Sequence, residues 1–205
     1  SHDIVGIMRK KFGTRRVGHT GTLDPMATGV LPICIGNATR ASDMLTESDK
    51  KYRVQLLLGK RTDTLDIEGD VLEERAVNVT EQEIRDVIDT FIGEIDQIPP
   101  MYSAIKKNGK KLYELARQGI EIEREPRRIN IYSIDIIDIN IPYITVDVHC
   151  SKGTYIRSLC DDIGTRLGTG AVMTELRRTY TAGFSIDDAY TIEQLDAIED
   201  LSKAL

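Results

Sequence analysis

The spacing of apolar side chains predicts a series of short amphipathic helices. Ile84, Val87 and Ile88 recur at intervals that place them on one face of a helix. Thr80 and Glu83 lie just before this stripe with the spacing of a capping box, which marks the beginning of a helix. The same reasoning predicts helices over residues 3–12, 80–91, 112–118, 155–167 and 191–198, the last of them also opened by a capping box.

Segments rich in β-branched residues predict strands between these helices. Residues 128–139 and 143–150 alternate partly between apolar and polar positions across a short turn, so they predict an antiparallel pair. Asn108 and Gly109 predict a tight hairpin within residues 103–113. Helices that interleave with an antiparallel pair favour an α+β fold, with a mixed, largely antiparallel central sheet flanked by helices. Further strands are expected over residues 30–35, 51–58 and 172–184.

The composition is that of a folded domain. Of the 205 residues, 40% are hydrophobic and 29% are charged, so we expect a single domain over residues 1–205. No uninterrupted apolar run approaches the roughly 20 residues of a membrane helix, and no signal-peptide pattern is present, so a cytoplasmic protein without membrane contact is expected. Cys34, Cys150 and Cys160 are irregularly spaced, which predicts reduced, buried thiols rather than a disulfide framework.

The charge is unevenly distributed along the chain. The net charge of −6 argues against a protein coated everywhere with nucleic acid, yet cations cluster near the amino terminus and around Asn108. This segregation is compatible with one basic face that binds a polyanion, and solvated surfaces without a partner are the alternative. The clustered cations are Arg9, Lys10, Lys11, Arg15, Arg16, Lys106, Lys107, Lys110, Lys111, Arg124, Arg127 and Arg128.

Residues suited to chemistry are concentrated between Gly18 and Gly29. Glycines on both sides of Asp24 allow a tight turn and the close approach of another molecule, while Pro25 fixes the backbone after the carboxylate. Asp24 is therefore a candidate catalytic carboxylate, and the alternative is an Asx turn in which it bonds the nearby backbone. The glycine spacing matches neither a phosphate loop nor a dinucleotide fingerprint. The histidines and cysteines match no standard zinc spacing, so no metal site is predicted.

A carboxylate needs a partner side chain that the fold brings to it. No serine or cysteine lies in a nucleophile elbow, which leaves a carboxylate assisted by an arginine, tyrosine or histidine. Tyr52 lies at the beginning of a predicted strand, and Arg157 follows a glycine break that leads into a predicted helix. A helix start beside an arginine is suited to hold an anion, although an exposed ion pair is the alternative for Arg157.

Four blocks of the sequence resemble one enzyme family, in order and over nearly the whole chain. These blocks are GHTGTLDPMATGVLPICIGNATR (18–40), KYRVQLLLGKRTDTLDIEGDV (51–71), IPPMYSAIKKNGKKLYELARQG (98–119) and HCSKGTYIRSLCDDIG (149–164), followed by Leu-Arg-Arg at 176–178. They resemble the TruB family, bacterial tRNA pseudouridine synthases that isomerise the uridine at position 55 of the T arm. The first block is long and unusual enough to carry the resemblance, which implies the pseudouridine synthase fold.

The resemblance implies the catalytic residues. Asp24 corresponds to the catalytic aspartate, Tyr52 to the aromatic residue that stacks on the target base and helps to remove its C5 proton, and Arg157 to the ion-pair partner of Asp24. An arginine beside a carboxylate keeps it ionised in a pocket where burial alone raises its pKa. The reaction flips the uridine out of the RNA, breaks the bond from N1 to C1′ and joins C5 to C1′, so the resemblance implies no cofactor and no metal.

The resemblance also implies residues that bind the RNA. Tyr155 and Leu176 are expected to line the uracil slot, His19 to help displace the nucleotide, and Asp66 to order the site by hydrogen bonding. The implied partner is the T stem-loop of tRNA, with no obligatory protein partner. Residues 101–128 resemble the family's mobile RNA-gripping insert, whose lysines around an Asn-Gly turn suit phosphate binding. The RNA contacts expected in this insert are Lys106, Lys111 and Arg117.

The sequence departs from the family pattern at both ends. Family members usually begin with a strand carrying Lys-Pro-x-Gly and a Thr-Ser pair, and this sequence starts at what corresponds to that serine. They often end in a small RNA-binding domain, whereas this sequence stops soon after its last predicted helix. We therefore expect a catalytic domain that lacks the edge strand and the carboxy-terminal RNA-binding domain.

Three other functions remain as alternatives. A guide-RNA-dependent pseudouridine synthase of the dyskerin type shares the aspartate block, but the segment GVLPICIGNATR and the basic insert disfavour it. A non-catalytic RNA-binding module is disfavoured because Asp24, Tyr52 and Arg157 are all present. A carbohydrate-cleaving enzyme ordinarily needs two cooperating carboxylates, and the aspartate block supplies one.

Overall fold

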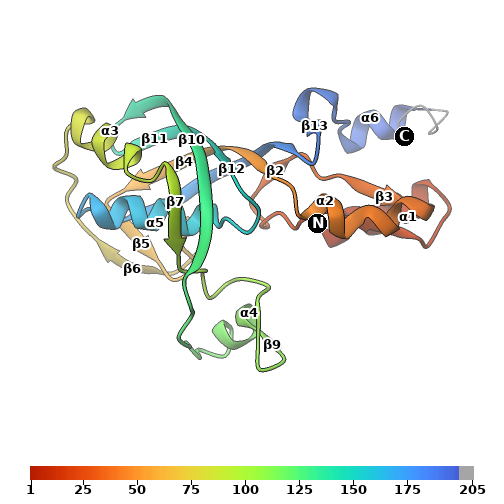
Figure 1. Ribbon diagram of the computed structural model, residues 1–205, viewed down its shortest axis with the longest axis horizontal. Helices are drawn as coiled ribbons and strands as arrows, with labels where there is room; N and C mark the ends of the chain where they lie inside the picture. The colour runs from red at the N-terminus through yellow and green to blue at the C-terminus, as the bar shows by residue number, and fades with distance from the viewer. Residues whose placement is uncertain (199–205) are drawn as a thin grey trace. The chain divides into compact units, whose positions relative to one another are not determined.

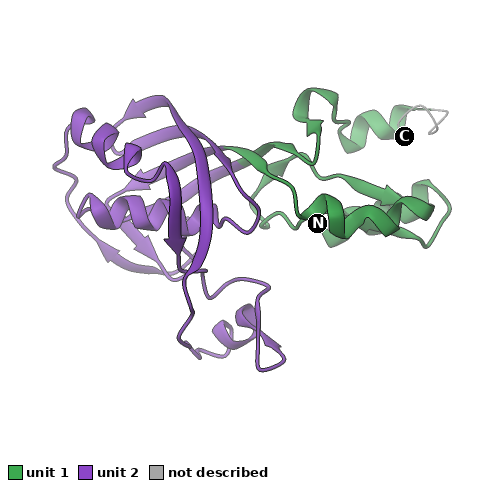
Figure 2. Cartoon of the chain, in the orientation of Figure 1, with its two compact units in different colours: residues 1–52, 177–205 green, residues 53–176 purple. Residues whose placement is uncertain are grey.

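The computed structural model describes residues 1–198, so residues 199–205 of the expected domain lie outside the described part. The helices and strands follow one another along the chain as labelled in Figure 1. They form two units, which Figure 2 colours separately. Unit 1 contains Ser1–Tyr52 and the chain from Arg177 onward, and unit 2 contains Arg53–Leu176. The expected organisation as a single domain remains a prediction.

The sheet of unit 2 is built from strands in the order β12, β4, β11, β10 and β7 (Figure 1). In β4 and β11, buried side chains alternate with more exposed ones, so each strand turns one face into the core. The pairings of β10 with β11 and with β7 are antiparallel. The strands are β4 (Lys50–Leu58), β7 (Gly93–Gln97), β10 (Arg127–Asn140), β11 (Tyr143–Cys150) and β12 (Ala171–Thr181).

Two helices of unit 2 contribute apolar stripes to its core. Helix α3 (Glu81–Asp89) packs against β10 and against helix α5 (Ile156–Arg166). Ile84 and Ile88 of α3 are fully buried, and the predicted capping box between Thr80 and Glu83 is present. Burial of such a stripe stabilises a short helix that is marginal in isolation.

Two hairpins and a short helix complete unit 2. Strands β5 (Lys60–Thr62) and β6 (Val71–Glu74) form an antiparallel pair, as do β8 (Lys106–Lys107) and β9 (Lys110–Lys111). The backbone of Asn108 and Gly109 has positive φ angles, which the tight turn between β8 and β9 requires and which Asn and Gly adopt readily. Helix α4 (Leu112–Ala116) follows this hairpin.

Unit 1 is assembled from two distant parts of the chain. Helix α1 (His2–Lys11) covers an antiparallel pair of strands. The core of unit 1 consists of Val5, Met8 and Val17. Ile192 and Leu195 of helix α6 pack against that core. Its elements after α1 are β1 (Val17–His19), β2 (Thr28–Gly29), β3 (Ile33–Ile35), a 3-10 helix η1 (Gly36–Ala41), α2 (Ser42–Thr46), β13 (Phe184–Ser185), a 3-10 helix η2 (Ile186–Asp188) and α6 (Ile192–Ala197).

Gly29 permits the closest backbone approach in unit 1. Strand β2 runs parallel to β12, with Gly29 opposite Arg178. The φ angle of Gly29 is +103°, and a Cβ atom built there lies 2.1 Å from the carbonyl oxygen of Arg178. Only glycine fits this position, because any side chain collides with backbone atoms that cannot move away.

The structure confirms the α+β fold with a mixed, mostly antiparallel sheet, and each predicted helix is present. The strand expected over 172–184 is interrupted by a turn in which Ala182 and Gly183 have positive φ angles, so β13 is a separate strand. The strand expected over 30–35 begins only at Ile33, after Pro32. Within residues 1–198 the three cysteines are buried and form no disulfide, as predicted. Among residues 1–198, no helix has the length and apolar character needed to cross a bilayer.

Candidate active site

Asp24 lies in the loop between β1 and β2 of unit 1. Its backbone carbonyl accepts a hydrogen bond of 3.0 Å from the amide of Ala27, which closes a turn with Pro25 at its second position. The preceding residue, Leu23, donates its amide to the Ser1 hydroxyl over 3.0 Å. Ser1, the residue that precedes helix α1, therefore holds the chain immediately before the candidate carboxylate.

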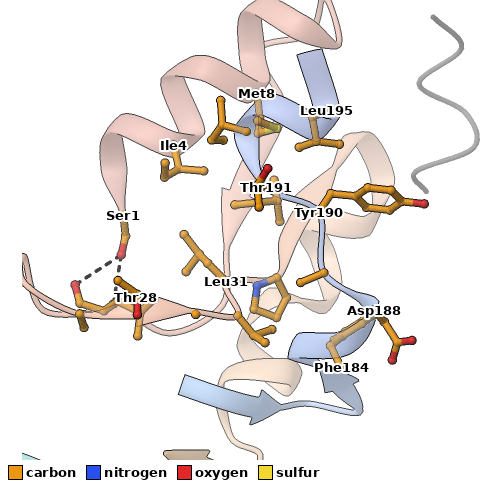
Figure 3. A pocket seen from close by; sticks show the side chains of 18 of the residues that line it. Ser1, Ile4, Met8, Thr28, Leu31, Phe184, Asp188, Tyr190, Thr191 and Leu195 are labelled. Atoms are coloured by element: carbon orange, nitrogen blue, oxygen red, sulfur yellow. Dashed lines mark hydrogen bonds between the residues drawn. The ribbon is translucent and has the colours of Figure 1, made fainter. Parts of the chain in front are cut away.

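The same loop borders an apolar cavity of about 780 Å³ within unit 1 (Figure 3). Asp24 lines this cavity together with side chains of α1, α6 and the loop before β3. Ile4 and Met8 extend from α1, and Leu195 extends from α6. The candidate carboxylate thus lies next to a largely apolar wall.

Arg178 joins the loop of Asp24 to Tyr52. Its guanidinium donates a hydrogen bond of 2.8 Å from Nε to the Val30 carbonyl and one of 3.3 Å from Nη2 to the Gly21 carbonyl. It is also hydrogen-bonded to the side chain of Tyr52. Only 1% of Arg178 is exposed, and this burial lowers the pKa of its guanidinium while the interaction with Tyr52 raises it.

The sequence predicts no role for Arg178. Its only signal is the Leu-Arg-Arg at 176–178, which resembles a family motif but does not show what the second arginine binds. The carbonyl groups that it contacts lie 148 and 157 positions away along the chain. In the structure, Arg178 fixes the two ends of the loop that contains Asp24, and it holds the aromatic residue of the candidate site.

His19 lies on β1 at the start of this loop. Burial lowers the pKa of its imidazole, and the nearby His2 and Arg178 lower it further. Its Nδ1 atom is buried and has no hydrogen-bond partner among residues 1–198. His19 is therefore neutral at pH 7, which suits a residue expected to occupy the space of a displaced nucleotide.

Arg157 is buried in unit 2, at the second residue of α5. Its side chain is 6% exposed, so the alternative of an exposed ion pair is excluded. Its Nη1 atom donates to the Thr64 carbonyl over 3.0 Å and lies 3.8 Å from Oδ2 of Asp66. Its Nη2 atom donates to the Tyr102 carbonyl over 2.8 Å. These contacts fix the orientation of a buried cation.

Asp66 has the hydrogen bonds of an ordered carboxylate. Its Oδ1 accepts from the Thr64 hydroxyl over 2.6 Å and from the Glu68 amide over 3.2 Å. Its backbone carbonyl accepts from the Thr62 hydroxyl over 2.7 Å. Because Asp66 is 7% exposed and lies near Arg157, it supplies negative charge beside the buried guanidinium.

Tyr155 and Leu176 also belong to unit 2. The side-chain amide of Gln97 donates to the Tyr155 carbonyl over 3.0 Å and accepts from the Tyr155 amide over 2.8 Å. This pair of bonds fixes the residue that begins α5. Leu176 lies on β12 and is 6% exposed. Their expected role in lining a uracil slot remains a prediction.

The predicted RNA contacts lie in one part of unit 2. Lys106 and Lys111 are opposite each other in the β8–β9 hairpin. The Nζ atom of Lys111 lies 5.4 Å from the ring centre of Tyr113, and Cζ of Arg117 lies 5.3 Å from the same centre. Cations around an aromatic ring suit the binding of nucleic acid, and the sequence analysis did not identify Tyr113 as part of this group.

The candidate catalytic residues are divided between the two units. Asp24, Tyr52 and His19 belong to unit 1, and Arg157 and Asp66 belong to unit 2. The pairing of Asp24 with Arg157 therefore remains a prediction. Among residues 1–198, no group of three or more histidine, cysteine or acidic side chains has the arrangement of a metal site.

Two family descriptions match consecutive parts of the chain. Residues 9–156 match the family described as "TruB family pseudouridylate synthase (N terminal domain)". Residues 157–204 match the one described as "tRNA pseudouridylate synthase B C-terminal domain". Together the two matches cover nearly the whole sequence.

Individual relatives agree with these matches. The tRNA pseudouridine synthase B of Alkaliphilus oremlandii is 57% identical over 205 residues, which are 100% of this chain and 69% of that protein. The tRNA pseudouridine synthase B of Clostridium tetani is 56% identical over 197 residues, which are 96% of this chain and 68% of that protein.

A solved structure has a similar fold. The structure titled "Crystal Structure of a Cbf5-Nop10-Gar1 Complex" contains a chain with a TM-score of 0.75 and 32% identity to this one. The alignment covers 95% of this chain and 50% of that chain, so the protein described here spans about half of its length.

Proposed function

This chain belongs to the TruB family of pseudouridylate synthases, and we propose that it converts a uridine of tRNA into pseudouridine. The high identity to two proteins named tRNA pseudouridine synthase B supports this activity. The proposed target is the uridine at position 55 of the T arm, which the sequence motifs imply, and the proposed location is the cytoplasm.

The proposed reaction is an isomerisation that needs no external reagent. The target uridine leaves its stack in the RNA arm, at a cost of a few kcal/mol that phosphate contacts elsewhere offset. The bond from N1 to C1′ breaks, the uracil rotates, and a bond from C5 to C1′ forms. The proton lost from C5 is balanced by the proton gained at N1, so atoms and electrons balance without a cofactor or a metal.

We assign the chemistry to Asp24, Tyr52 and Arg157. The carboxylate of Asp24 acts on the sugar, on the base or on a proton of the nucleotide, and Arg157 keeps it ionised. Tyr52 stacks on the uracil and helps to remove the C5 proton. The observation that carries this assignment is the set of hydrogen bonds made by Arg178, which joins the loop of Asp24 to the side chain of Tyr52.

Replacing Asp24 by asparagine tests the proposal. The protein alone is mixed with an unmodified T-arm hairpin, and pseudouridine is measured in the RNA. We expect the wild type to react, and we expect Asp24→Asn to bind the hairpin while its turnover falls by at least about a thousandfold. Asp138→Asn is the matched control, because Asp138 is exposed on β10, and it should retain full activity. Turnover by Asp24→Asn at the wild-type rate would refute the assignment.

The same assay separates the proposal from its main alternatives. A guide-RNA-dependent synthase produces no pseudouridine in the hairpin unless a guide RNA is added. The greater identity to the tRNA pseudouridine synthases B than to the chain in the Cbf5 complex favours action without a guide. A module that only binds RNA retains the hairpin in both the wild type and Asp24→Asn but forms no product.

A further inference from the structure

Two backbone carbonyl groups hold the guanidinium of Arg157, and they come from different parts of unit 2. The Thr64 carbonyl belongs to the turn between β5 and β6, and the Tyr102 carbonyl belongs to the start of the basic insert, residues 101–128. A displacement of either segment therefore moves an acceptor of Arg157. Through the carbonyl of Tyr102, the insert contacts Arg157 of the candidate site.

The side chain of Tyr102 makes a second bond to the same turn. Its hydroxyl donates to Oδ2 of Asp63 over 3.2 Å, and Oδ1 of Asp63 accepts from the Asp70 amide over 2.8 Å. Burial raises the pKa of the Tyr102 hydroxyl, and the negative charge of Asp63 raises it further. The hydroxyl therefore keeps its proton at physiological pH and remains a donor. Tyr102 thus bridges Arg157 and the turn, through its carbonyl on one side and its hydroxyl on the other.

The turn between β5 and β6 is a rigid support for this bridge. Leu65 has a φ angle of +64°, and the side chain of Asp66 accepts two hydrogen bonds within the turn. A Cβ atom at Gly69 would lie 2.2 Å from the Thr64 hydroxyl and 2.6 Å from Oδ1 of Asp63, so the backbone is packed directly against these side chains. A segment so closely packed has few alternative arrangements.

Residues one and three positions after Tyr102 are hydrogen-bonded to the rest of the insert. The carbonyl of Ser103 accepts from the Tyr113 amide over 3.1 Å, and the carbonyl of Ile105 accepts from the Leu112 amide over 2.8 Å. Tyr113 is the aromatic residue that contacts Lys111 and Arg117. The positive charge of Arg117 also acts on the Tyr102 hydroxyl. The predicted RNA contacts and the acceptor of Arg157 therefore belong to one continuous hydrogen-bonded segment.

We propose that Tyr102 is a positioning residue that couples the basic insert to Arg157. RNA seated on the insert fixes the segment that begins at Tyr102, and the bond from its hydroxyl to Asp63 fixes the carbonyl that orients Arg157. This inference rests on the proposed function, which gives Arg157 its place in the chemistry. The role assigned to Tyr102 is exerted through Arg157 and not on the reacting atoms.

Tyr102→Phe tests the coupling because it removes only the hydroxyl. Small displacements of a catalytic group reduce the rate of the chemical step strongly, while phosphate contacts of the insert remain. Under single-turnover conditions with saturating T-arm hairpin, we expect the rate of pseudouridine formation to fall about tenfold, and the Kd for the hairpin to change less than about twofold. Tyr143→Phe is the control, because Tyr143 is an exposed tyrosine at the start of β11, and it should leave both quantities unchanged.

A double-mutant cycle shows whether Tyr102 acts through Asp63. Asp63→Asn keeps an oxygen acceptor for the Asp70 amide but weakens the bond from the tyrosine. If the two side chains act as one unit, the double variant Tyr102→Phe with Asp63→Asn is no slower than the slower single variant. The coupling would be overturned if the fold-losses in rate of the two single variants multiplied in the double variant. An unchanged rate in Tyr102→Phe would overturn it as well.

An activity-independent measurement separates this inference from the proposed function. Amide hydrogen exchange at residues 103–117 should be faster in Tyr102→Phe than in the wild type and in Tyr143→Phe, because the insert has lost one of its attachments. If the wild type forms no pseudouridine, the proposed function fails. If amide exchange is equal in all three proteins, the Tyr102 hydroxyl does not hold the insert, and the coupling is refuted. An active wild type with an equally active Tyr102→Phe leaves the function standing and refutes the coupling alone.

Discussion

Asp162 is a half-buried acid that the proposed chemistry does not use. It lies on α5, five positions after Arg157, and its pKa is raised to about 6. The main cause is burial, and the negative charge of Asp161 adds to it, while Arg166 opposes both. The folded protein therefore holds a proton that the unfolded chain releases from about pH 4 upward. The contribution of Asp162 to stability falls as the pH rises through 6.

We expect Asp162→Asn to stabilise the protein at pH 8 and to have little effect at pH 4. The amide removes the buried negative charge, and the gain in the free energy of unfolding is about 1 kcal/mol once the partly exposed position is taken into account. Urea unfolding midpoints at the two pH values measure it. Asp161→Asn should have the opposite effect and destabilise the protein at pH 8. The reason is that the Asp161 carboxylate accepts hydrogen bonds of 2.9 and 3.3 Å from the Arg61 guanidinium. A lower midpoint for Asp162→Asn at pH 8 contradicts the expectation.

The sequence reveals some site residues and hides others for a physical reason. Asp24 stands out because the glycines and proline that shape its turn are its neighbours in the sequence. Arg178 and Tyr102 do not stand out, because their partners lie far away along the chain. Periodicity identifies residues that pack, and local motifs identify residues in turns, but neither identifies a side chain whose role is to hold a distant backbone carbonyl.

At the scale of single elements, two helices of different surroundings begin with the same capping box. Thr80 caps α3, which buries two isoleucines, and Thr191 caps α6, in which no residue is buried. We expect Thr80→Ala to lower the free energy of unfolding by about 1 kcal/mol, because loss of the cap weakens a helix that belongs to the core. Thr191→Ala should mainly increase amide exchange within α6, with a smaller change in the unfolding midpoint. Equal changes in the midpoint for both variants disagree with this prediction.

The prediction of elements succeeded where periodicity was strong and local. The helix at 80–91, the antiparallel pair near 128–150 and the Asn-Gly hairpin are confirmed, because each is encoded by neighbouring residues. Strand β7 and the pair β5–β6 were not predicted. They are short and polar, and β7 is paired with Arg127–Ile131 of β10, on the side of β10 opposite β11. Such strands depend on a partner that the local sequence does not show.

At the scale of the whole molecule, the acidic net charge coexists with a basic insert. Lys106→Ala together with Lys111→Ala should weaken tRNA binding and lower the slope of log Kd against log salt by about 1.5, because each lost phosphate contact releases fewer counterions. Binding measured between low and moderate salt tests this. The double variant Arg53→Ala with Arg85→Ala removes the same charge from exposed positions outside both basic clusters, and it should keep the wild-type slope. An unchanged slope in the insert variant would show that the two lysines do not contact phosphate.

The two units are completed at different times during translation, because unit 1 is made of two separate segments of the chain. Unit 2 is one unbroken stretch, whereas unit 1 waits for a second piece that is translated after it. At typical translation speeds this delay is on the order of ten seconds. Until synthesis has passed Arg178, strand β2 lacks its partner and the two carbonyls that flank Asp24 lack their donor. The nascent chain is therefore expected to remain inactive until the late arrival of this one arginine shapes the loop that contains Asp24.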